Sequence, residues 1–397
     1  MSQVLAFNAP TTARSGNRWA WALWLIVMLV MCGLMLSGNR RSVTPAYHGA
    51  ALRWLSSRPL YDDSGRGFLY LPTAAVAYVP FAVLPHTAGE IAWRLLAIGC
   101  YAWGLWRACR LIQQQDGRQL FLLATLLTLP LCLSSARNGQ STLPMTGLML
   151  LGAVAAAEGR WWRSAACLAL SVALKPLAIV MFLLMGGVHA PLRWRLPLAL
   201  AAVFAAPFLL QTPAYVATQY AGCWEMFQAA SDFGYVPRWS QPFAALEVWG
   251  LAVPRVVQTI LRVLAAGLTL GLALYAQRKW QPPRAAIWIF TLAACYLMLF
   301  NPRTENNTYS CLGPAIGLAF AFSWGRQHWL TAGYVLLAIG VVAGWSLSRL
   351  VASEIPPIWL APLSATIFAG ICVRQIFDVP IVAQPAESAP MPRRLAA

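Results

Sequence analysis

The sequence predicts an all-α, polytopic membrane protein. Of its 397 residues, 59% are hydrophobic and only 10% are charged, a balance that ordinary soluble domains do not have. Several apolar runs approach or exceed the ~20 residues that a helix needs to cross a ~30 Å hydrocarbon core. We expect about 10 to 12 transmembrane or re-entrant segments in one domain over residues 1–377. Residues 378–397, rich in Pro, Ala and Ser, are expected to form a disordered cytoplasmic tail.

The first apolar segment, residues 19–36, follows Arg14 and Arg18. It is longer than the apolar core of a signal peptide and lacks a convincing cleavage site, so we interpret it as an uncleaved helix. If the two arginines stay inside, the polar stretch 38–70 becomes the first extracytoplasmic loop. Helical spacing of Tyr47, Ala50, Ala51 and Trp54 within this loop predicts an amphipathic helix on the membrane surface.

The arginines also constrain how the later segments cross. If every segment spanned fully, the basic stretches 107–118 and 160–163 would lie outside, against the positive-inside tendency. A re-entrant path for 70–84 and for the run 165–185 removes that conflict. Four polar stretches then share the outer side: 38–70, 137–140, 211–242 and 301–309. The alternative is full spans with a few misplaced arginines.

The net charge of +17 does not indicate nucleic-acid binding, because the basic residues lie mainly between apolar runs and can meet anionic lipid there. Nearly all of them are arginine, which binds phosphate through a planar fork of donors; only Lys175 and Lys279 are lysines. The nine cysteines form no CxxC pair and the four histidines are scattered. We therefore expect no metal site and no cofactor.

Two groups in the first loop are candidates for chemistry. Asp62 and Asp63 are adjacent acids that suit a general base or a metal ligand, although Tyr-Asp-Asp-Ser-Gly is also good turn composition. Arg58 and Arg66 suit the phosphate of a lipid substrate, or equally the headgroups of ordinary anionic lipids.

Lys175 is the most informative single residue. A lysine within an apolar run costs about 2.5–3.5 kcal/mol to insert and is usually retained for function or paired. Pro176 directly after it breaks the helix. We interpret Lys175 as a cavity-lining cation that contacts phosphate; the alternative is a lysine that snorkels from a loop between two spans.

The stretch 301–309 concentrates Arg303, Glu305, Asn306 and Asn307 between two apolar segments. Their donors and acceptors suit sugar hydroxyls or a phosphate, and the alternative is a plain connecting loop. The aromatic side chains of the polar loop 211–242 are expected to anchor it at the interface, unless they form a wall on which a sugar stacks.

Several short motifs follow one another along the chain in a characteristic order. They are Tyr61-Asp62 followed by Phe68, Tyr70 and Pro72; Asn138-Gly139-Gln140; Ala173-Leu174-Lys175-Pro176; Ser240-Gln241; and Pro302-Arg303 with Tyr309 and Pro314-Ala315. This series resembles glycosyltransferase family 87, polyprenyl-phosphate-mannose-dependent enzymes with the GT-C architecture. The resemblance implies a GT-C-like helical bundle with a substrate site that includes Tyr70, Asn138, Gln140, Lys175, Gln241, Arg303 and Tyr309. The polar composition of 301–309 adds Asn306 and Asn307 to the candidate substrate-binding residues. Two positions depart from the family: its aspartate after the first helix falls at about Ser42 or Val43, and its asparagine after Gly-Gln falls at Thr142.

The resemblance implies an inverting transfer of a mannose-like hexose or a pentose from a polyprenyl phosphate to a glycolipid or polysaccharide acceptor. The expected location is the extracytoplasmic face of a bacterial inner membrane, with membrane lipids as surroundings. With the family aspartate missing, we rank Asp62 first as base, then Glu305, then Asp63. Glu90 fits this role less well because we expect it inside. The competing hypotheses are a carrier or flippase for a lipid-linked saccharide, which needs no base, and a non-catalytic partner in envelope polysaccharide assembly.

Overall fold

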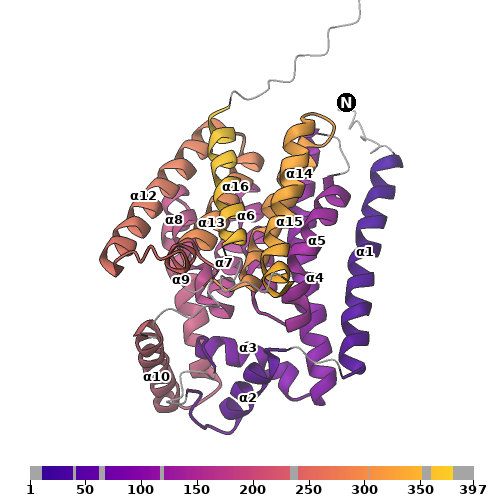
Figure 1. Ribbon diagram of the computed structural model, residues 1–397. Coiled ribbons are helices and arrows are strands. Elements are labelled where there is room, and N and C mark those ends of the chain that lie inside the picture. The colour runs from indigo at the N-terminus through magenta and orange to yellow at the C-terminus, as the bar shows by residue number, and fades with distance from the viewer. Residues whose placement is uncertain are drawn as a thin grey trace, which may run out of the picture.

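The computed structural model describes residues 11–38, 42–61, 68–116, 120–232, 240–302, 304–350 and 359–378. Over these ranges every regular element is a helix, so the all-α prediction is confirmed. The long helices run between two ends of the molecule (Figure 1). We call the end that carries α2 (Thr44–Leu55), α3 (Pro72–Ala82) and α10 (Pro213–Asp232) the α2 end. The opposite end, where Arg107, Arg160, Arg195 and Lys279 lie, is the arginine-rich end.

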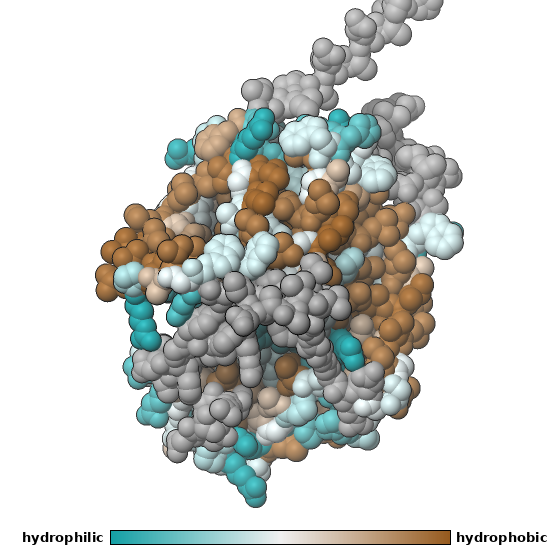
Figure 2. All heavy atoms as spheres, viewed as in Figure 1, coloured by the Kyte–Doolittle hydropathy of each residue, from teal (hydrophilic) through white to brown (hydrophobic). Residues whose placement is uncertain are grey.

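Seven of the described helical stretches are long and apolar enough to cross a membrane. These are Asn17–Leu36, His86–Gln113, Leu120–Asn138, Leu192–Leu209, Arg255–Lys279, Pro282–Phe300 and Leu360–Phe377. Large apolar side chains on their outer faces are exposed, among them Leu29, Ile260, Leu264 and Leu268. Figure 2 shows a belt of hydrophobic surface, in brown, that includes the regions of α1 (Thr11–Leu36) and α12 (Arg255–Lys279). Such a belt is stable only against lipid or another apolar surface, and the chain is a multi-pass membrane protein.

The remaining helices complete the bundle. They are α4 (His86–Asp116), α5 (Leu120–Asn138), α6 (Thr142–Ala157), α7 (Trp161–Leu174), α8 (Ile179–Val188), α9 (Leu192–Ala205), α11 (Pro242–Val248), α13 (Pro282–Phe300), α14 (Gly313–Ser323), α15 (His328–Leu350) and α16 (Leu360–Phe377), with the 3₁₀ turns η1 (Pro176–Ala178), η2 (Ala206–Leu209) and η3 (Asn306–Cys311). Several begin with proline, which fits the first helical turn because the missing N–H has no partner there. Gly139, at φ +65°, lets the chain turn sharply from α5 into α6.

Close helix contacts in the core depend on small residues. A Cβ added at Gly147 in α6 would lie 2.5 Å from the Cys100 carbonyl oxygen in α4, and one at Gly104 in α4 would lie 2.7 Å from the Gly147 carbonyl oxygen. Backbones that approach this closely are typical of membrane helix pairs, where packing and not water exclusion drives association.

The run broken at Lys175 and Pro176 returns to the end from which it starts. The rings of Trp161, at the start of α7, and His189, just after α8, are 5.6 Å apart, and Trp162 and Trp194 are 5.1 Å apart. The two helices therefore form a hairpin whose tip carries Lys175, as expected for a re-entrant segment. The short helix α3 likewise stays at the α2 end, beside α2 (Figure 1).

The predicted helix in the first loop forms as α2, but the structure corrects its surroundings. Its apolar face, which includes Tyr47, Ala50, Ala51 and Trp54, is buried and packs in one cluster with residues of α3 and α4. Protein therefore covers the face that was expected to contact lipid.

The stretch 211–242 also differs from expectation. Most of it is the 20-residue helix α10, not a loop. Gln219 in α10 accepts a hydrogen bond from the Leu60 N–H at 2.8 Å, and Tyr215 donates one to the Arg58 carbonyl at 2.7 Å. Gln219 and Tyr215, two of the polar side chains in this stretch, therefore hold α10 against the segment after α2.

Candidate functional site

Lys175 lies where α7 ends and η1 begins. Its backbone is extended (φ −153°, ψ 117°), because Pro176 disfavours helical geometry in the residue before it. The half-buried side chain reaches the start of α6, and its Nζ donates a hydrogen bond to Thr142 Oγ1 at 2.7 Å. The hairpin therefore presents a cation beside the turn between α5 and α6.

That turn carries Gln140. Its backbone N–H donates to the Ser135 carbonyl at 3.0 Å, and its Nε2 lies 3.5 Å from Glu305 Oε2, at the outer limit for a hydrogen bond. Glu305 itself is exposed and precedes η3. Glu305 and Lys175 therefore approach the same turn, Glu305 at Gln140 and Lys175 at Thr142.

Two tyrosines lie beside the same turn, where the Tyr47 hydroxyl is 3.4 Å from Ser141 Oγ. Tyr47 in α2 donates to the Tyr70 hydroxyl at 2.9 Å, and the two rings meet edge to face. Burial raises the pKa of Tyr70 well above its ordinary value, and the nearby Tyr47 and Glu305 act in the same direction. Burial also raises the pKa of Tyr47, against the lowering effect of its hydrogen bonds to Ser141 and Tyr70. Both side chains are therefore neutral at physiological pH, and they can orient a hydroxyl or phosphate without repelling it. We call Tyr47, Tyr70, Gln140, Thr142, Lys175 and Glu305 the polar cluster.

The segment that carries Glu305 is held from both sides. Ser134 donates to Asn307 Oδ1 and Ser135 to the Asn307 carbonyl, each at 2.6 Å. Tyr309 is buried, and its hydroxyl donates to the Ser240 carbonyl at 2.8 Å. Gln241 is also buried and donates to the Pro302 carbonyl at 3.0 Å. In this arrangement Tyr309 and Gln241 bond within the protein and position the Glu305 segment.

A second group, built on the buried side chains of Glu90 and Arg94, supports the same turn from α4. Arg94 Nη2 donates to Ser42 Oγ at 2.8 Å and to the Arg137 carbonyl at 3.2 Å, and Arg94 Nη1 lies 3.9 Å from Glu90 Oε2. Ser42 and Thr44 both donate to Glu90 Oε1. This network corrects the expectation that Glu90 lies at the opposite face.

The turn between α5 and α6 has further backbone ties to the same group. Trp93 Nε1 donates to the Gly139 carbonyl at 2.8 Å, and the Val43 N–H donates to the Asn138 carbonyl at 3.0 Å. The Asn138 side chain is half-buried. These contacts place Asn138, Glu90 and Ser42 together at the α2 end.

The structure brings only some of the predicted site residues together. Asn138, Gln241 and Tyr309 form hydrogen bonds within the protein beside the cluster. Tyr70, Gln140, Lys175 and Glu305 come together. Asn306 and Asn307 lie in η3 directly after Glu305, whereas the Arg58 side chain is exposed at the end of the segment after α2. The predictions for Asp62, Asp63, Arg66 and Arg303 fall outside the described residues.

Sequence reasoning missed the contributions of Tyr47, Ser141 and Thr142. Thr142 had been noted only as a departure from a family pattern, and Tyr47 only as part of an apolar face. In the described part of the chain, no three histidine, cysteine, aspartate or glutamate side chains gather into a candidate metal site.

The architecture and the polar cluster define a multi-pass membrane protein with a polar site where several helices break. The model of glycosyltransferase family 87 matches residues 68–302, more than half of the chain. The chain belongs to glycosyltransferase family 87, so the resemblance stated from its motifs is confirmed.

Two solved structures of ArnT from Cupriavidus metallidurans are similar in shape. The undecaprenyl-phosphate-bound structure has a TM-score of 0.44 and 16% identity, covering 89% of this chain and 76% of that one. The apo structure has a TM-score of 0.46 and 14% identity, covering 92% and 77%. No curated protein matches the sequence.

Proposed function

We propose that the chain transfers a sugar, a mannose-like hexose or a pentose, from a polyprenyl-phosphate donor to a glycolipid or polysaccharide acceptor. The observation that carries this proposal is the polar cluster, in which Lys175, at the tip of the α7–α8 hairpin, and Glu305 both contact the turn from α5 into α6. Membership of a glycosyltransferase family supplies the reaction class. The active side is proposed to be extracytoplasmic, because the polar cluster lies opposite the arginine-rich end.

Donor binding follows from the chemistry of Lys175. An ammonium group in a half-buried position pairs strongly with a phosphate, since charge-assisted hydrogen bonds are about twice as strong as neutral ones. Thr142 holds Nζ in place before the donor arrives. Tyr47, Tyr70 and Gln140 supply donors and acceptors for sugar hydroxyls and phosphate oxygens.

Transfer requires a base for the acceptor hydroxyl. Among the described residues, Glu305 is the carboxylate of the polar cluster, and its exposure allows an acceptor to reach it. Glu305 takes the proton from the acceptor hydroxyl while the acceptor oxygen forms a bond to the anomeric carbon. The bond from that carbon to the phosphate oxygen breaks, and the polyprenyl phosphate leaves with its negative charge balanced by Lys175. One displacement of this kind inverts the anomeric configuration. Asp62 and Asp63 remain alternative bases in the segment that the structure does not describe.

The test is reconstitution of the purified protein in liposomes with a radiolabelled polyprenyl-phosphate mannose and a mixed glycolipid acceptor fraction. We expect labelled acceptor and released polyprenyl phosphate in equal amounts. Movement of intact donor across the bilayer without bond cleavage would instead establish the carrier hypothesis. If the folded protein carried out neither reaction, the result would favour a non-catalytic partner in envelope polysaccharide assembly.

A further inference from the structure

A cavity of about 610 Å³ opens between α13, α14 and α16 at the arginine-rich end. Its lining includes no residue of the polar cluster. α14 begins just after η3, near Glu305, and its later residues line the cavity, so the cavity lies farther along α14 from the polar cluster. The volume is within the ~300–1,000 Å³ range of small-molecule sites.

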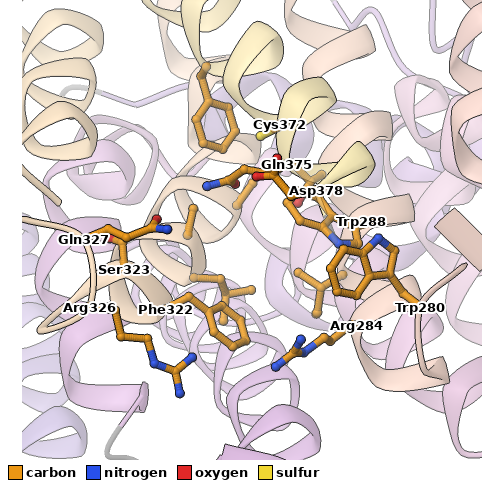
Figure 3. Close-up of a pocket in the computed structure, with 16 residues that line it drawn as sticks. Trp280, Arg284, Trp288, Phe322, Ser323, Arg326, Gln327, Cys372, Gln375 and Asp378 are labelled. Carbon is orange, nitrogen blue, oxygen red and sulfur yellow. The ribbon is translucent and has the colours of Figure 1, made fainter. Parts of the chain in front are cut away.

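The lining has an apolar part and a polar part. Ile287, Leu318, Phe322 and Phe368 supply apolar walls on the three helices. Polar side chains come from the helix ends and the adjoining turns: Arg284, Arg326, Gln327, Gln375 and Asp378. In Figure 3 the guanidinium groups of Arg284 and Arg326 lie on the same side of the cavity and point toward one another. Apolar walls next to basic side chains at the helix ends suit an amphiphile with an anionic head.

The walls of the cavity are fixed by contacts inside the protein. Lys279 Nζ donates to the Phe377 carbonyl at 2.7 Å and Trp280 Nε1 to the Ile376 carbonyl at 3.3 Å, so both cap the carboxyl end of α16. Tyr334 donates to Gln375 Oε1 at 3.2 Å, which leaves the Gln375 NH₂ group to donate to a ligand. The cavity is therefore shaped before anything binds, which reduces the entropic cost of binding.

The charges of the polar lining residues favour a ligand with an anionic headgroup. Arg284, Arg326 and Asp378 together carry one net positive charge. Two guanidinium groups match the oxygens of a single phosphate, whose geometry accepts their paired donors. Trp280 and Trp288 also line the cavity, and tryptophan is enriched at the level of lipid headgroups.

We propose that this cavity binds a membrane phospholipid, with its phosphate between Arg284 and Arg326 and an acyl chain against Phe322 and Phe368. The site is separate from the polar cluster and does not depend on the donor.

Native mass spectrometry of the detergent-purified protein tests this proposal with three probes: phosphatidylglycerol, diacylglycerol with the same chains, and inorganic phosphate. We expect phosphatidylglycerol to bind at least about tenfold more tightly than either of the others, because only it supplies both head and chain. Arg284→Gln with Arg326→Gln should abolish the preference over diacylglycerol. Ala319→Trp, which fills the apolar part, should weaken phosphatidylglycerol while the thermal unfolding midpoint reports whether that variant folds.

Arg193→Gln is the matched control, since Arg193 is an exposed arginine that does not line the cavity. It should leave phosphatidylglycerol binding unchanged. Equal binding of phosphatidylglycerol and diacylglycerol, or an equal loss in the control, would overturn the proposal. Binding of inorganic phosphate as tight as that of the lipid would show an anion site and would also overturn it.

Discussion

Lys175 Nζ donates a hydrogen bond to Thr142 Oγ1 across 2.7 Å, which joins the tip of the α7–α8 hairpin to the start of α6. The bond fixes a flexible side chain whose conformational freedom otherwise costs about 1.5–2 kcal/mol to remove. The ammonium group retains two further protons for a ligand. A cation fixed in this way is suited to hold the phosphate of a lipid donor.

Replacement of Lys175 by alanine is expected to weaken binding of polyprenyl-phosphate mannose about tenfold or more, because a hydrogen bond to a charged group is lost. Donor affinity in detergent micelles is the measurement. Lys279→Ala is the control, since Lys279 is the other lysine and lies at the arginine-rich end. Wild-type affinity in Lys175→Ala would contradict the role in donor binding.

Loss of one partner of the buried Glu90–Arg94 pair is expected to lower the free energy of unfolding substantially. Both side chains are about 2% exposed, and Arg94→Met would leave the Glu90 carboxylate uncompensated, at a cost of about 3–5 kcal/mol in the free energy of unfolding. The double variant Glu90→Leu with Arg94→Met should recover much of that loss. Chemical denaturation in detergent measures both.

Arg160→Met gives the comparison for an exposed pair. Arg160 is half exposed and lies 3.1 Å from Glu158, so its loss should cost about 0–1 kcal/mol. If Arg94→Met were as mild as Arg160→Met, the buried network would not stabilise the turn at Gly139.

The third prediction concerns the close backbone contact between α4 and α6. Gly147→Ala places a methyl group 2.5 Å from the Cys100 carbonyl oxygen, where the backbone must move, and should destabilise by about 1–3 kcal/mol. Gly271→Ala in α12 meets nothing within 4 Å and should be neutral or slightly stabilising. The thermal unfolding midpoints of the two variants in the same detergent decide this prediction.

The hairpin geometry predicts the sidedness of labelling. In a background whose native cysteines are replaced, Arg160→Cys and Arg193→Cys should react with a membrane-impermeant thiol reagent from the same side. Asn306→Cys should react from the opposite side. Labelling of residues 160 and 193 from different sides would mean that the run broken at Lys175 crosses the bilayer.

The sequence was sufficient to predict the helical class, the first helix, α2 and the break at Lys175, because each depends on local composition or on proline. It was insufficient for α10, whose polar side chains turned out to bond to the segment after α2. The link between Glu305 and Gln140 joins residues 165 positions apart, and no local pattern specifies such a pairing. Tyr47 was recognised as apolar but not as a hydrogen-bond donor to Tyr70, because that role depends on how α2 packs.

The central claim is that sugar transfer takes place at the polar cluster with Glu305 as base. The most direct test is the single-turnover rate of Glu305→Gln at saturating donor, with Glu225→Gln, an exposed glutamate in α10, as the control. We expect the rate to fall about 10²–10⁴-fold in Glu305→Gln, with little change in donor affinity, and to stay near wild type in the control. A rate within a few-fold of wild type in Glu305→Gln would contradict the claim and return the base to Asp62 or Asp63.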